Sequence, residues 1–469
     1  MSKRNTTLTT DQKALAVNLD KFKYGSIVEI GAGQEVARRF FHVGAAAGTI
    51  AKTMSAYDMA VSDDIYGPVD RYVSRARLMQ MLEKEFAQVV SRLSRVRPRN
   101  TTFFAYAATV TARSFKQKNE CHGWIGLRLQ LHPGAEPSDI VMHVRMLDND
   151  NILQSEALGI LGVNLIHGAF FNYTQPEWIV GGLADGLASD RIEVDVIHFA
   201  GPYFEEVENR LMNLHLIRSW LTRAVVFNPD GEVVVPGELF YRKPVMVMRG
   251  SFKPVTKVNV DMMKAGQRQF CEVESVDQRQ LVSLAEITMN SLISGDNVDN
   301  ADFLARVDLL ASLGYTVMIS DYVRFFRLRA YLRRYTHKEI GIVLSVRDFE
   351  PLFDEKYYDG LEGGMLEAFG KLFPDNTHVY TYPSRPRGQD ELITLDTVKV
   401  PANLRHLLAH LVENGKLVGI EHHDASLLHI DASEVLAGLR RGRGEWEQDV
   451  PEAVAERIME RRLLGFESE

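Results

Sequence analysis

The sequence predicts an α/β protein whose central region is a mainly parallel sheet with helices on both faces. Two observations lead to this fold class. Strand-like and helix-like segments alternate from about residue 175 onward. The strand segments are apolar throughout and not only at every second position, which is typical of strands buried on both faces of a parallel sheet.

The chain is longer than one hydrophobic core usually supports, because it has 469 residues. We expect an N-terminal α+β domain over residues 1–174 with a β-rich part. A Rossmann-like α/β domain is expected over residues 175–386. A small α-rich appendage at the C-terminus, residues 387–469, follows a Pro/Gly-containing linker.

The N-terminal part combines helical repeats with three neighbouring strand-like runs between residues 101 and 147, as in an antiparallel meander. Helices are predicted at 11–24, 71–95 and 152–171. Segment 44–67 is rich in small residues, and two interpretations of it stay open: a closely packed helix or a phosphate-facing loop.

A short strand, Ser26–Ile30, ends in Gly31-Ala32-Gly33 before a helix. This arrangement resembles the first motif of methyltransferases that bind S-adenosylmethionine, and more loosely a dinucleotide loop. Glycines at this place serve equally well for tight strand-to-helix packing, and Glu35 would repel a phosphate. The sequence leaves both interpretations open.

The region after residue 175 contains the alternation on which the fold class rests. Strands are predicted at 192–199, 223–227, 244–248, 315–320, 340–346 and 378–382. Helices are predicted at 205–221, 281–293, 302–313, 323–335, 403–414 and 452–464.

The stretch Pro244–Gly266 joins a strand, a small-residue turn and a helix. The apolar run stops at Arg249-Gly250, and a helix-compatible segment starts at Thr256. A helix that begins directly after such a turn presents free backbone N–H groups to a phosphate. Ligands of parallel sheets bind at the carboxyl ends of the strands. We therefore expect the edges of a ligand site to be formed by residues at three strand ends: Asp195/His198, Arg249–Thr256 and Ser320–Asp321.

The segment Met248–Met263, MRGSFKPVTKVNVDMM, resembles the nucleotide-binding signature of the nucleotidylyltransferase superfamily. That superfamily includes the nicotinate and nicotinamide mononucleotide adenylyltransferases. That pattern is an apolar strand, Gly-(Ser/Thr)-Phe-x-Pro, and a (His/Thr)-x-x-His pair that opens a helix. A partial second signature is seen at Ile319–Arg324. The resemblance implies that a nucleotide contacts Gly250, Ser251, Phe252, Thr256, Ser320 and Arg324.

The reaction that this resemblance implies is adenylyl transfer from ATP, with Mg²⁺, to a mononucleotide in NAD biosynthesis. Such transfer needs in-line positioning and cations or donors for the leaving pyrophosphate, and no enzyme nucleophile. Asn259 stands where the family has its second histidine, and it cannot carry a positive charge. The candidate catalytic residues are therefore Lys253, Lys257 and Asn259.

A longer block, Glu29–Gly67, is similar to an uncharacterised bacterial protein family. A different class of function is therefore kept open. In this alternative the chain is a non-catalytic assembly or regulatory protein, an inactive relative of the nucleotidylyltransferases that forms a homo-oligomer.

The composition restricts the partners. A net charge of −8 argues against a nucleic-acid binder, and two cysteines suggest a reduced compartment. No run approaches the roughly 20 apolar residues that span a bilayer. We expect a cytoplasmic homo-oligomer that binds a nucleotide or another phosphorylated small molecule, and neither nucleic acid nor membrane.

Two further clusters are open to interpretation. Arg327, Arg334 and Lys338 lie close together at helical spacing and suit either a phosphate or an intramolecular ion-pair surface. The segment His422–Asp431 is rich in histidine and aspartate. An exposed turn is favoured over a zinc site, since adjacent histidines on a strand point to opposite faces. No metal site is assigned.

Overall fold

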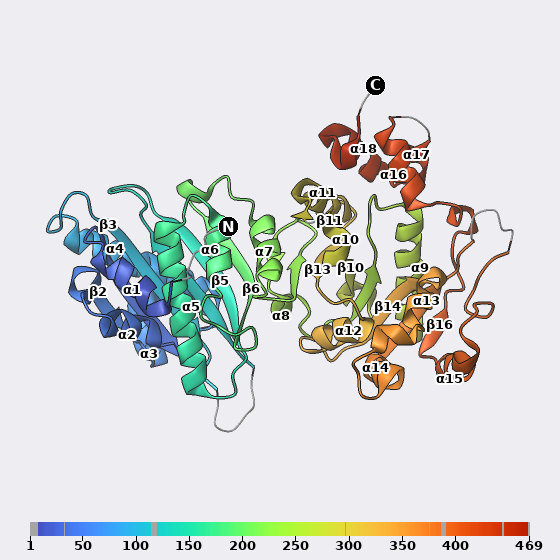
Figure 1. Cartoon of the computed structure of the whole chain (residues 1–469), viewed down its shortest axis with the longest axis horizontal. Coiled ribbons are helices and arrows are strands. Elements are labelled where there is room, and N and C mark those ends of the chain that lie inside the picture. Colours follow the sequence, from blue (N-terminus) through green and yellow to red (C-terminus); the bar gives the residue numbers. More distant parts are fainter. Residues whose placement is uncertain are drawn as a thin grey trace, which may run out of the picture. The chain divides into compact units, whose positions relative to one another are not determined.

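The computed structural model describes residues 8–31, 33–113, 120–295, 297–374, 376–385, 391–442 and 445–467. Contacts between residues divide the chain into two compact units, Met1–Arg223 and Ala224–Glu469 (Figure 1). Both units combine a large sheet with helices, so the predicted α/β class is confirmed.

The first unit is built on a six-stranded sheet in the order β2-β1-β3-β4-β5-β6. β1 pairs in parallel with β2 and β3, and the remaining neighbours are antiparallel. The strands are β1 (Lys23–Gly31), β2 (Ile50–Met54), β3 (Thr102–Val110), β4 (Cys121–Leu129), β5 (Ser138–Met146) and β6 (Ile192–Ala200).

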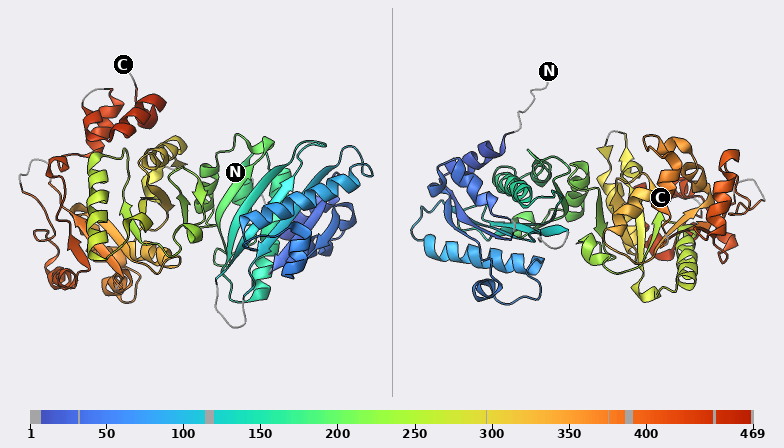
Figure 2. Two further views of the ribbon diagram at one scale, coloured as in Figure 1. Left: turned by 180° about the vertical axis from the view of Figure 1, so that it is seen from behind. Right: turned by 90° about the horizontal axis from the view of Figure 1, so that it is seen from below.

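Helices cover both faces of this sheet, with α4 on one face and α1, α2 and α5 on the other (Figure 2). Glycines let them approach closely. A Cβ at Gly126 of β4 would lie 2.8 Å from the Leu82 side chain of α4, and one at Gly162 of α5 would lie 2.4 Å from Val36 of α2. The helices are α1 (Thr10–Leu19), α2 (Glu35–His42), α3 (Met59–Tyr66), α4 (Arg75–Leu93), α5 (Asn151–Phe171), α6 (Pro176–Gly182) and α7 (Asn209–Arg218).

The outer strand β6 has its edge closed by side chains of α7. The Asn213 amide accepts the N–H of Ile197 at 3.0 Å and donates to its carbonyl at 2.7 Å. Asn209 makes the same pair of bonds to Phe199, at 2.7 and 3.0 Å. Side-chain amides thus satisfy backbone groups that a further strand would otherwise pair with.

The second unit is built on an eight-stranded sheet in the order β16-β15-β14-β9-β10-β13-β7-β8. The six strands from β16 to β13 are parallel, whereas β7 runs antiparallel to β13 and β8. The strands are β7 (Ala224–Phe227), β8 (Val233–Val234), β9 (Val245–Arg249), β10 (Val282–Thr288), β13 (Thr316–Ser320), β14 (Ile340–Ser345), β15 (Thr377–Tyr382) and β16 (Leu417–Gly419), beside a separate hairpin of β11 (Ile293–Ser294) and β12 (Asn297–Val298).

Helices lie on both faces of this second sheet as well. α9 contacts β9, β14 and β15 on one face, while the other face packs against α12, α13 and α14. The C-terminal part is largely helical, as expected. The helices are α8 (Pro236–Leu239), α9 (Lys257–Val273), α10 (Met289–Leu292), α11 (Asn300–Ala311), α12 (Phe325–Arg333), α13 (Phe349–Leu352), α14 (Gly364–Leu372), α15 (Arg405–Glu413), α16 (Ala432–Arg440), α17 (Trp446–Asp449) and α18 (Glu452–Arg461).

Three expectations about single elements were wrong. Residues 192–199 form a strand, but it is the antiparallel β6 of the first sheet and not part of the parallel sheet. Residues 281–293 begin with strand β10 and not with a helix, and β10 is buried between β9 and β13. The segment expected as a packed helix or phosphate loop contains β2, which pairs with β1.

The pairing of β6 moves the division between the units. The contacts divide the chain after Arg223, whereas the sequence suggested a boundary after residue 174. The other expected boundary, between residues 386 and 387, lies outside the described residues.

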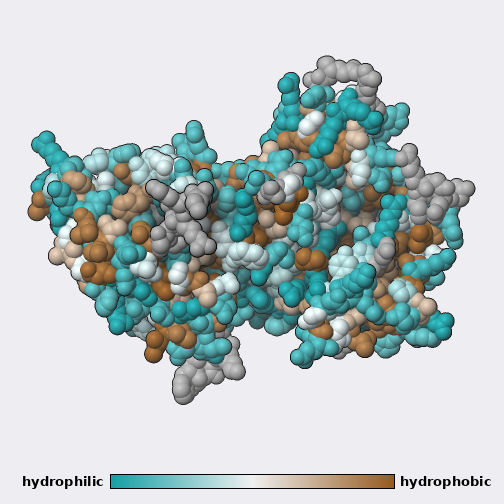
Figure 3. Space-filling view, in the orientation of Figure 1, coloured by the Kyte–Doolittle hydropathy of each residue, from teal (hydrophilic) through white to brown (hydrophobic). Residues whose placement is uncertain are grey.

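In the described part of the chain, helices long enough to cross a bilayer are not apolar enough to do so. The face seen in Figure 3 is mostly hydrophilic, with hydrophobic residues in small groups among polar ones.

Candidate functional site

The stretch that joins strand, turn and helix lies at the carboxyl edge of the second sheet. β9 ends at Arg249, residues 250–256 form the connection, and α9 begins at Lys257. The chain continues from β9 to β10 on one side of β9, whereas the later strand β14 pairs on its other side. The strand order therefore reverses between β9 and β14. In open α/β sheets such a reversal leaves a crevice at the carboxyl ends of the two strands.

Arg249 fixes the geometry at the end of β9. Its guanidinium bonds both carboxylate oxygens of Glu286, which is fully buried at the end of β10. The same group donates to the backbone oxygens of Tyr322 and Val323, at 2.6 and 2.7 Å. Ser320 at the end of β13 donates its hydroxyl to Glu286. The carboxyl ends of three adjacent strands are thus locked together around one buried charge.

This network bears on the prediction for Ser320. Its hydroxyl is buried and bonded to Glu286, which makes it part of the support of the site. Sequence analysis missed Glu286, although a carboxylate inside the apolar run VSLAEIT was a signal for it.

A second buried charge cluster holds the turn after β9. Lys253 pairs with Asp302 at 2.8 Å, and the Asp302 carboxylate also binds the guanidinium of Arg306. Arg306 is 2% exposed and donates to the backbone oxygen of Ser251 at 3.1 Å. Two side chains from α11 therefore support the turn, and Lys253 serves in an ion pair.

The start of α9 is capped from within. Thr256 is fully buried, and its N–H and hydroxyl both donate to the Asn259 amide oxygen at 3.0 Å. Asn259 therefore has only its amide N–H₂ group left for a ligand. Lys257, at the first helical position, is half-buried and forms no ion pair with any described residue. Of the three predicted catalytic residues, Lys257 is the available cation.

Gly250, which the sequence motif predicts to contact a nucleotide, lies under an aromatic ring. A Cβ at Gly250 would lie 2.9 Å from the ring of Phe252, which is buried and has a positive φ of 48°. The Gly250 N–H donates to the Glu286 backbone oxygen at 3.1 Å. Gly250 thus allows the Phe252 ring to fold back over the end of β9.

The strand on the other side of the reversal also ends in charged residues. After β14, solvent reaches Asp348, yet the surrounding protein raises the pKa of its carboxyl by desolvation. This effect outweighs a backbone hydrogen bond at Ser345 and the positive charges of Arg347 and Arg249, which act in the opposite direction. A carboxyl group and two guanidinium groups thus act on one another across the β9–β14 boundary.

The His422–Asp431 segment lies beside this edge. The Asp261 carboxylate on α9 accepts the Tyr382 hydroxyl at 2.6 Å and the Asp424 N–H at 2.9 Å. Asp424 and Asp431 cap the short helical segments that follow them. These aspartates therefore have local structural partners, in agreement with the interpretation as a turn.

Arg327 of the predicted basic cluster borders a cavity of about 620 Å³, whereas Arg334 and Lys338 do not line it. Arg324 and Arg327 line it from α12 and the residue before it, and Lys356 lines it from the 3₁₀ helix η5 (Glu355–Tyr358). Arg324 donates to the Asp359 backbone oxygen at 3.5 Å. Through the bonds of Arg249 to the residues before Arg324, this cavity is connected to the end of β9.

The sequence matches no protein-family model and no curated protein. Nicotinic acid mononucleotide adenylyltransferase of Plasmodium falciparum, complexed with APC, gives a TM-score of 0.30 at 11% identity over 48% of this chain and 99% of its own. A putative nicotinate-nucleotide adenylyltransferase of Vibrio parahaemolyticus gives 0.24 at 14% identity, over 48% and 96%. The competence/damage inducible protein CihA of Agrobacterium tumefaciens gives 0.24 at 17% identity, over 36% and 100%.

The likeness to nucleotidylyltransferases is thus weak and covers less than half of the chain. With TM-scores of this size it carries no argument about function.

The Gly31–Gly33 loop of the first unit leads into a helix whose first free N–H groups already donate to a side chain of the protein. Glu29 is 4% exposed, and its carboxylate accepts the N–H groups of Val36 and Ala37 at 3.1 and 3.2 Å. Burial nevertheless raises its pKa to about 7. An internal carboxylate thus stands where a cofactor phosphate would bind, which favours the packing interpretation of this loop. Ala32 lies outside the described residues.

A chain of three polar groups crosses the first sheet. Asp195, 1% exposed, lies 2.6 Å from Nδ1 of His143, whose Nε2 lies 3.1 Å from Nδ1 of His122. Burial lowers the pKa of His122 to about 4, so its ring is neutral at pH 7. The expectation that Asp195 and His198 border a site of the parallel sheet was wrong, because both lie on β6.

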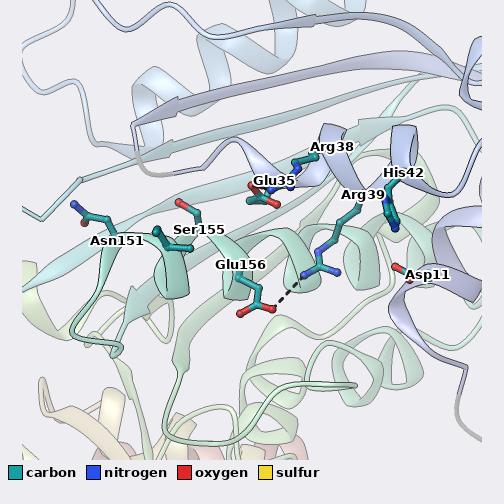
Figure 4. Close-up of a pocket in the computed structure, with 9 residues that line it drawn as sticks. Asp11, Glu35, Arg38, Arg39, His42, Asn151, Ser155 and Glu156 are labelled. Carbon is teal, nitrogen blue, oxygen red and sulfur yellow. Dashed lines mark hydrogen bonds and ion pairs between the residues drawn. The ribbon is translucent and has the colours of Figure 1, made fainter.

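A cavity of about 760 Å³ opens in the first unit between α1, α2 and α5 (Figure 4). Its arginine and glutamate side chains are paired: Arg38 with Glu35 at 2.9 Å, and Arg39 with Glu156 at 3.9 Å.

A group of potential metal ligands in the described part of the chain is Glu274, Glu339 and His378, whose ligand atoms lie within 4.8 Å of one another. Glu339 and His378 lie at the amino ends of β14 and β15, and Glu274 follows the end of α9. The predicted Mg²⁺ has no comparable group of ligands around Gly250–Asn259 among the described residues.

Proposed function

We propose that this protein binds a nucleotide or another phosphorylated small molecule at residues 250–259. The observation that carries the proposal is the position of the connection between β9 and α9. It leaves the carboxyl edge of a parallel sheet where the strand order reverses between β9 and β14. Helix starts at such positions offer backbone N–H groups to phosphates.

The chemistry of this connection supports an anionic ligand. Lys257 lies on the first turn of α9 and is not paired with any described carboxylate. The turn before it is held by Arg306 and by the Lys253–Asp302 pair. A preorganised loop beside an available cation binds phosphate with little loss of conformational freedom.

As the specific reaction we propose adenylyl transfer from ATP to nicotinate or nicotinamide mononucleotide. A phosphate oxygen of the mononucleotide forms a bond to the α-phosphorus of ATP, and the bond between the α- and β-phosphates breaks to release pyrophosphate. Lys257 and the amide N–H₂ of Asn259 would stabilise the charge that develops on the leaving group. Mg²⁺ bound to ATP would neutralise part of the same charge.

Binding is tested by calorimetry with ATP, NAD and nicotinate mononucleotide. Lys257→Ala is expected to weaken ATP binding about tenfold, the effect of one charge-assisted hydrogen bond. Lys264→Ala is the matched control, because Lys264 is exposed farther along α9. Gly250→Asp should abolish binding. Gly250→Ala adds a Cβ beside the Phe252 ring without a charge, so it separates the effect of the aspartate charge from the displacement of Phe252. Absence of binding of ATP, NAD and nicotinate mononucleotide at millimolar concentration would refute the proposed nucleotide site.

Catalysis is tested separately by pyrophosphate release with ATP and either mononucleotide. Release that requires both substrates is expected. ATP binding without any release would instead favour the non-catalytic alternative, a binding protein of the same fold.

A further inference from the structure

The cavity between α12 and η5 differs from the cavity between α1, α2 and α5 in the charges that line it. Both cavities belong to single units, and both are of a size that suits small-molecule ligands. In the first unit, arginine and glutamate side chains pair with each other along the wall (Figure 4). The cavity in the second unit has cations that lack such partners.

Three cations converge on this second cavity. Arg324, Arg327 and Lys356 form no ion pair with any described carboxylate. Arg324 bonds a backbone oxygen, and Arg327 lies 6.0 Å from the centroid of the Phe326 ring. Of the two alternatives left open for Arg327, these contacts favour the phosphate over an intramolecular ion pair. In a protein with a net charge of −8, unpaired cations gathered at one cavity favour an anionic ligand.

The support of these cations is rigid. Arg249 bonds the backbone oxygens of Tyr322 and Val323, and its guanidinium lies 4.4 Å from the centroid of the Phe325 ring. These residues flank Arg324 on both sides. Because Arg249 is itself held by the buried Glu286, the start of α12 is positioned before any ligand binds.

The lining indicates the class of the ligand. Two carboxylates, Asp321 and Asp359, accompany the three cations and leave one positive charge in excess. Guanidinium groups bind phosphate oxygens with two parallel hydrogen bonds. Tyr357 adds an exposed aromatic ring, and Leu361 adds an apolar surface. Such a wall suits a phosphate attached to a sugar or a ring.

We infer that this cavity binds the phosphate of a small phosphomonoester through Arg324, Arg327 and Lys356. The inference goes beyond the proposed function, because Arg327 and Lys356 have no part in it; Arg324, expected from the sequence to contact the nucleotide, is assigned to this cavity instead. It holds whether or not ATP binds at residues 250–259. If both sites bind, the second site lies at the same edge of the sheet as the first.

The experiment measures binding of ribose 5-phosphate by calorimetry to the full chain, with ribose as the ligand that lacks the phosphate. Arg327 and Lys356 are exposed, so replacing them with alanine leaves the packing of the unit intact. We expect each single variant to weaken ribose 5-phosphate binding about tenfold or more, since each removes a charge-assisted hydrogen bond. Arg279→Ala, in an exposed pair with Asp277, is the matched control and should leave binding unchanged.

Equal binding of ribose and ribose 5-phosphate would overturn the inference, as would unchanged binding in the Arg327→Ala and Lys356→Ala variants. No binding to the original chain at millimolar concentration would overturn it too. Gly250→Asp distinguishes the two proposals. Ribose 5-phosphate binding that survives Gly250→Asp and is lost in Arg327→Ala supports this cavity, even if the original chain binds no ATP. A third outcome would refute the inference about this cavity and leave the proposed function intact. In it, Gly250→Asp abolishes ATP binding, while Arg327→Ala leaves ribose 5-phosphate binding unchanged.

Discussion

The buried carboxyl of Glu29 allows a quantitative prediction about the stability of the first unit. Its folded-state pKa is about 7 against an ordinary value of 4.5, because desolvation outweighs the hydrogen bonds from Val36 and Ala37. Between these two pH values the folded chain holds a proton that the unfolded chain has lost. The free energy of unfolding therefore falls as the pH rises from about 4.5 to about 7, and it stays lowered above pH 7.

The size of this effect follows from the shift. A difference of roughly 2.5 pKa units at about 1.4 kcal/mol per unit gives about 3 kcal/mol, of which about 2 kcal/mol develop between pH 5 and pH 8. Glu29→Gln keeps one oxygen that accepts an N–H of α2 and removes the ionisation. We expect this variant to gain stability relative to the original chain as the pH rises from 5 to 8.

The measurement is urea unfolding at pH 5 and pH 8, followed by tryptophan fluorescence. Trp124, Trp178 and Trp220 lie in the first unit, so the signal mainly reports its unfolding. Glu136→Gln, at an exposed position of the first unit, is the control and should show no comparable pH dependence. If the stability difference between the Glu29→Gln variant and the original chain is the same at both pH values, Glu29 does not titrate in this range and the reasoning fails.

Two further predictions concern buried contacts. Glu286→Ala leaves the Arg249 guanidinium without its carboxylate, and we expect a loss of about 3 kcal/mol or more in the free energy of unfolding. A loss below about 1 kcal/mol in urea unfolding would contradict the assigned role of this ion pair. Gly162→Ala puts a Cβ 2.8 Å from the Tyr106 hydroxyl oxygen, which should destabilise the first unit by about 1–3 kcal/mol. Gly181→Ala, with no atom within 4 Å of its added Cβ, should keep the melting temperature, and an equal effect of both changes would refute the packing argument.

The architecture of the second unit was predictable because its strands are apolar on both faces. Val245–Arg249 and Ile340–Ser345 are fully or nearly buried, and the sequence indicated both as strands of a parallel sheet. Periodicity identifies a strand but not its neighbour. For this reason residues 192–199 were correctly expected as a strand and assigned to the wrong sheet.

The assignment of β10 failed for a different reason. Leu281, Leu284, Ala285 and Leu292 repeat at helical spacing, although Val282 and Ile287 favour a strand. In the fold this segment lies between β9 and β13, where it is buried from both faces. Packing between β9 and β13 thus determined that this segment forms a strand, although its local sequence favoured neither helix nor strand clearly.

The candidate site was predictable in its location and less so in its chemistry. The turn and helix start around Gly250 and Thr256 lie at the carboxyl edge, as the pattern indicated. Whether Lys253 faces a ligand depends on Asp302, which is about 50 residues away in the sequence. Spacing alone cannot reveal such a partner, because the contact exists only after α11 packs beside the turn.

The two asparagines that close the edge of β6 have a consequence for association between copies of the chain. An edge strand usually exposes a row of N–H and C=O groups to which another chain can add a strand. On β6, the groups of Ile197 and Phe199 already bond Asn213 and Asn209, and the Val194 N–H donates to the Leu221 backbone oxygen at 2.9 Å. A homo-oligomer of this protein is therefore not expected to form by strand addition at β6, because the backbone groups of Ile197 and Phe199 already have partners.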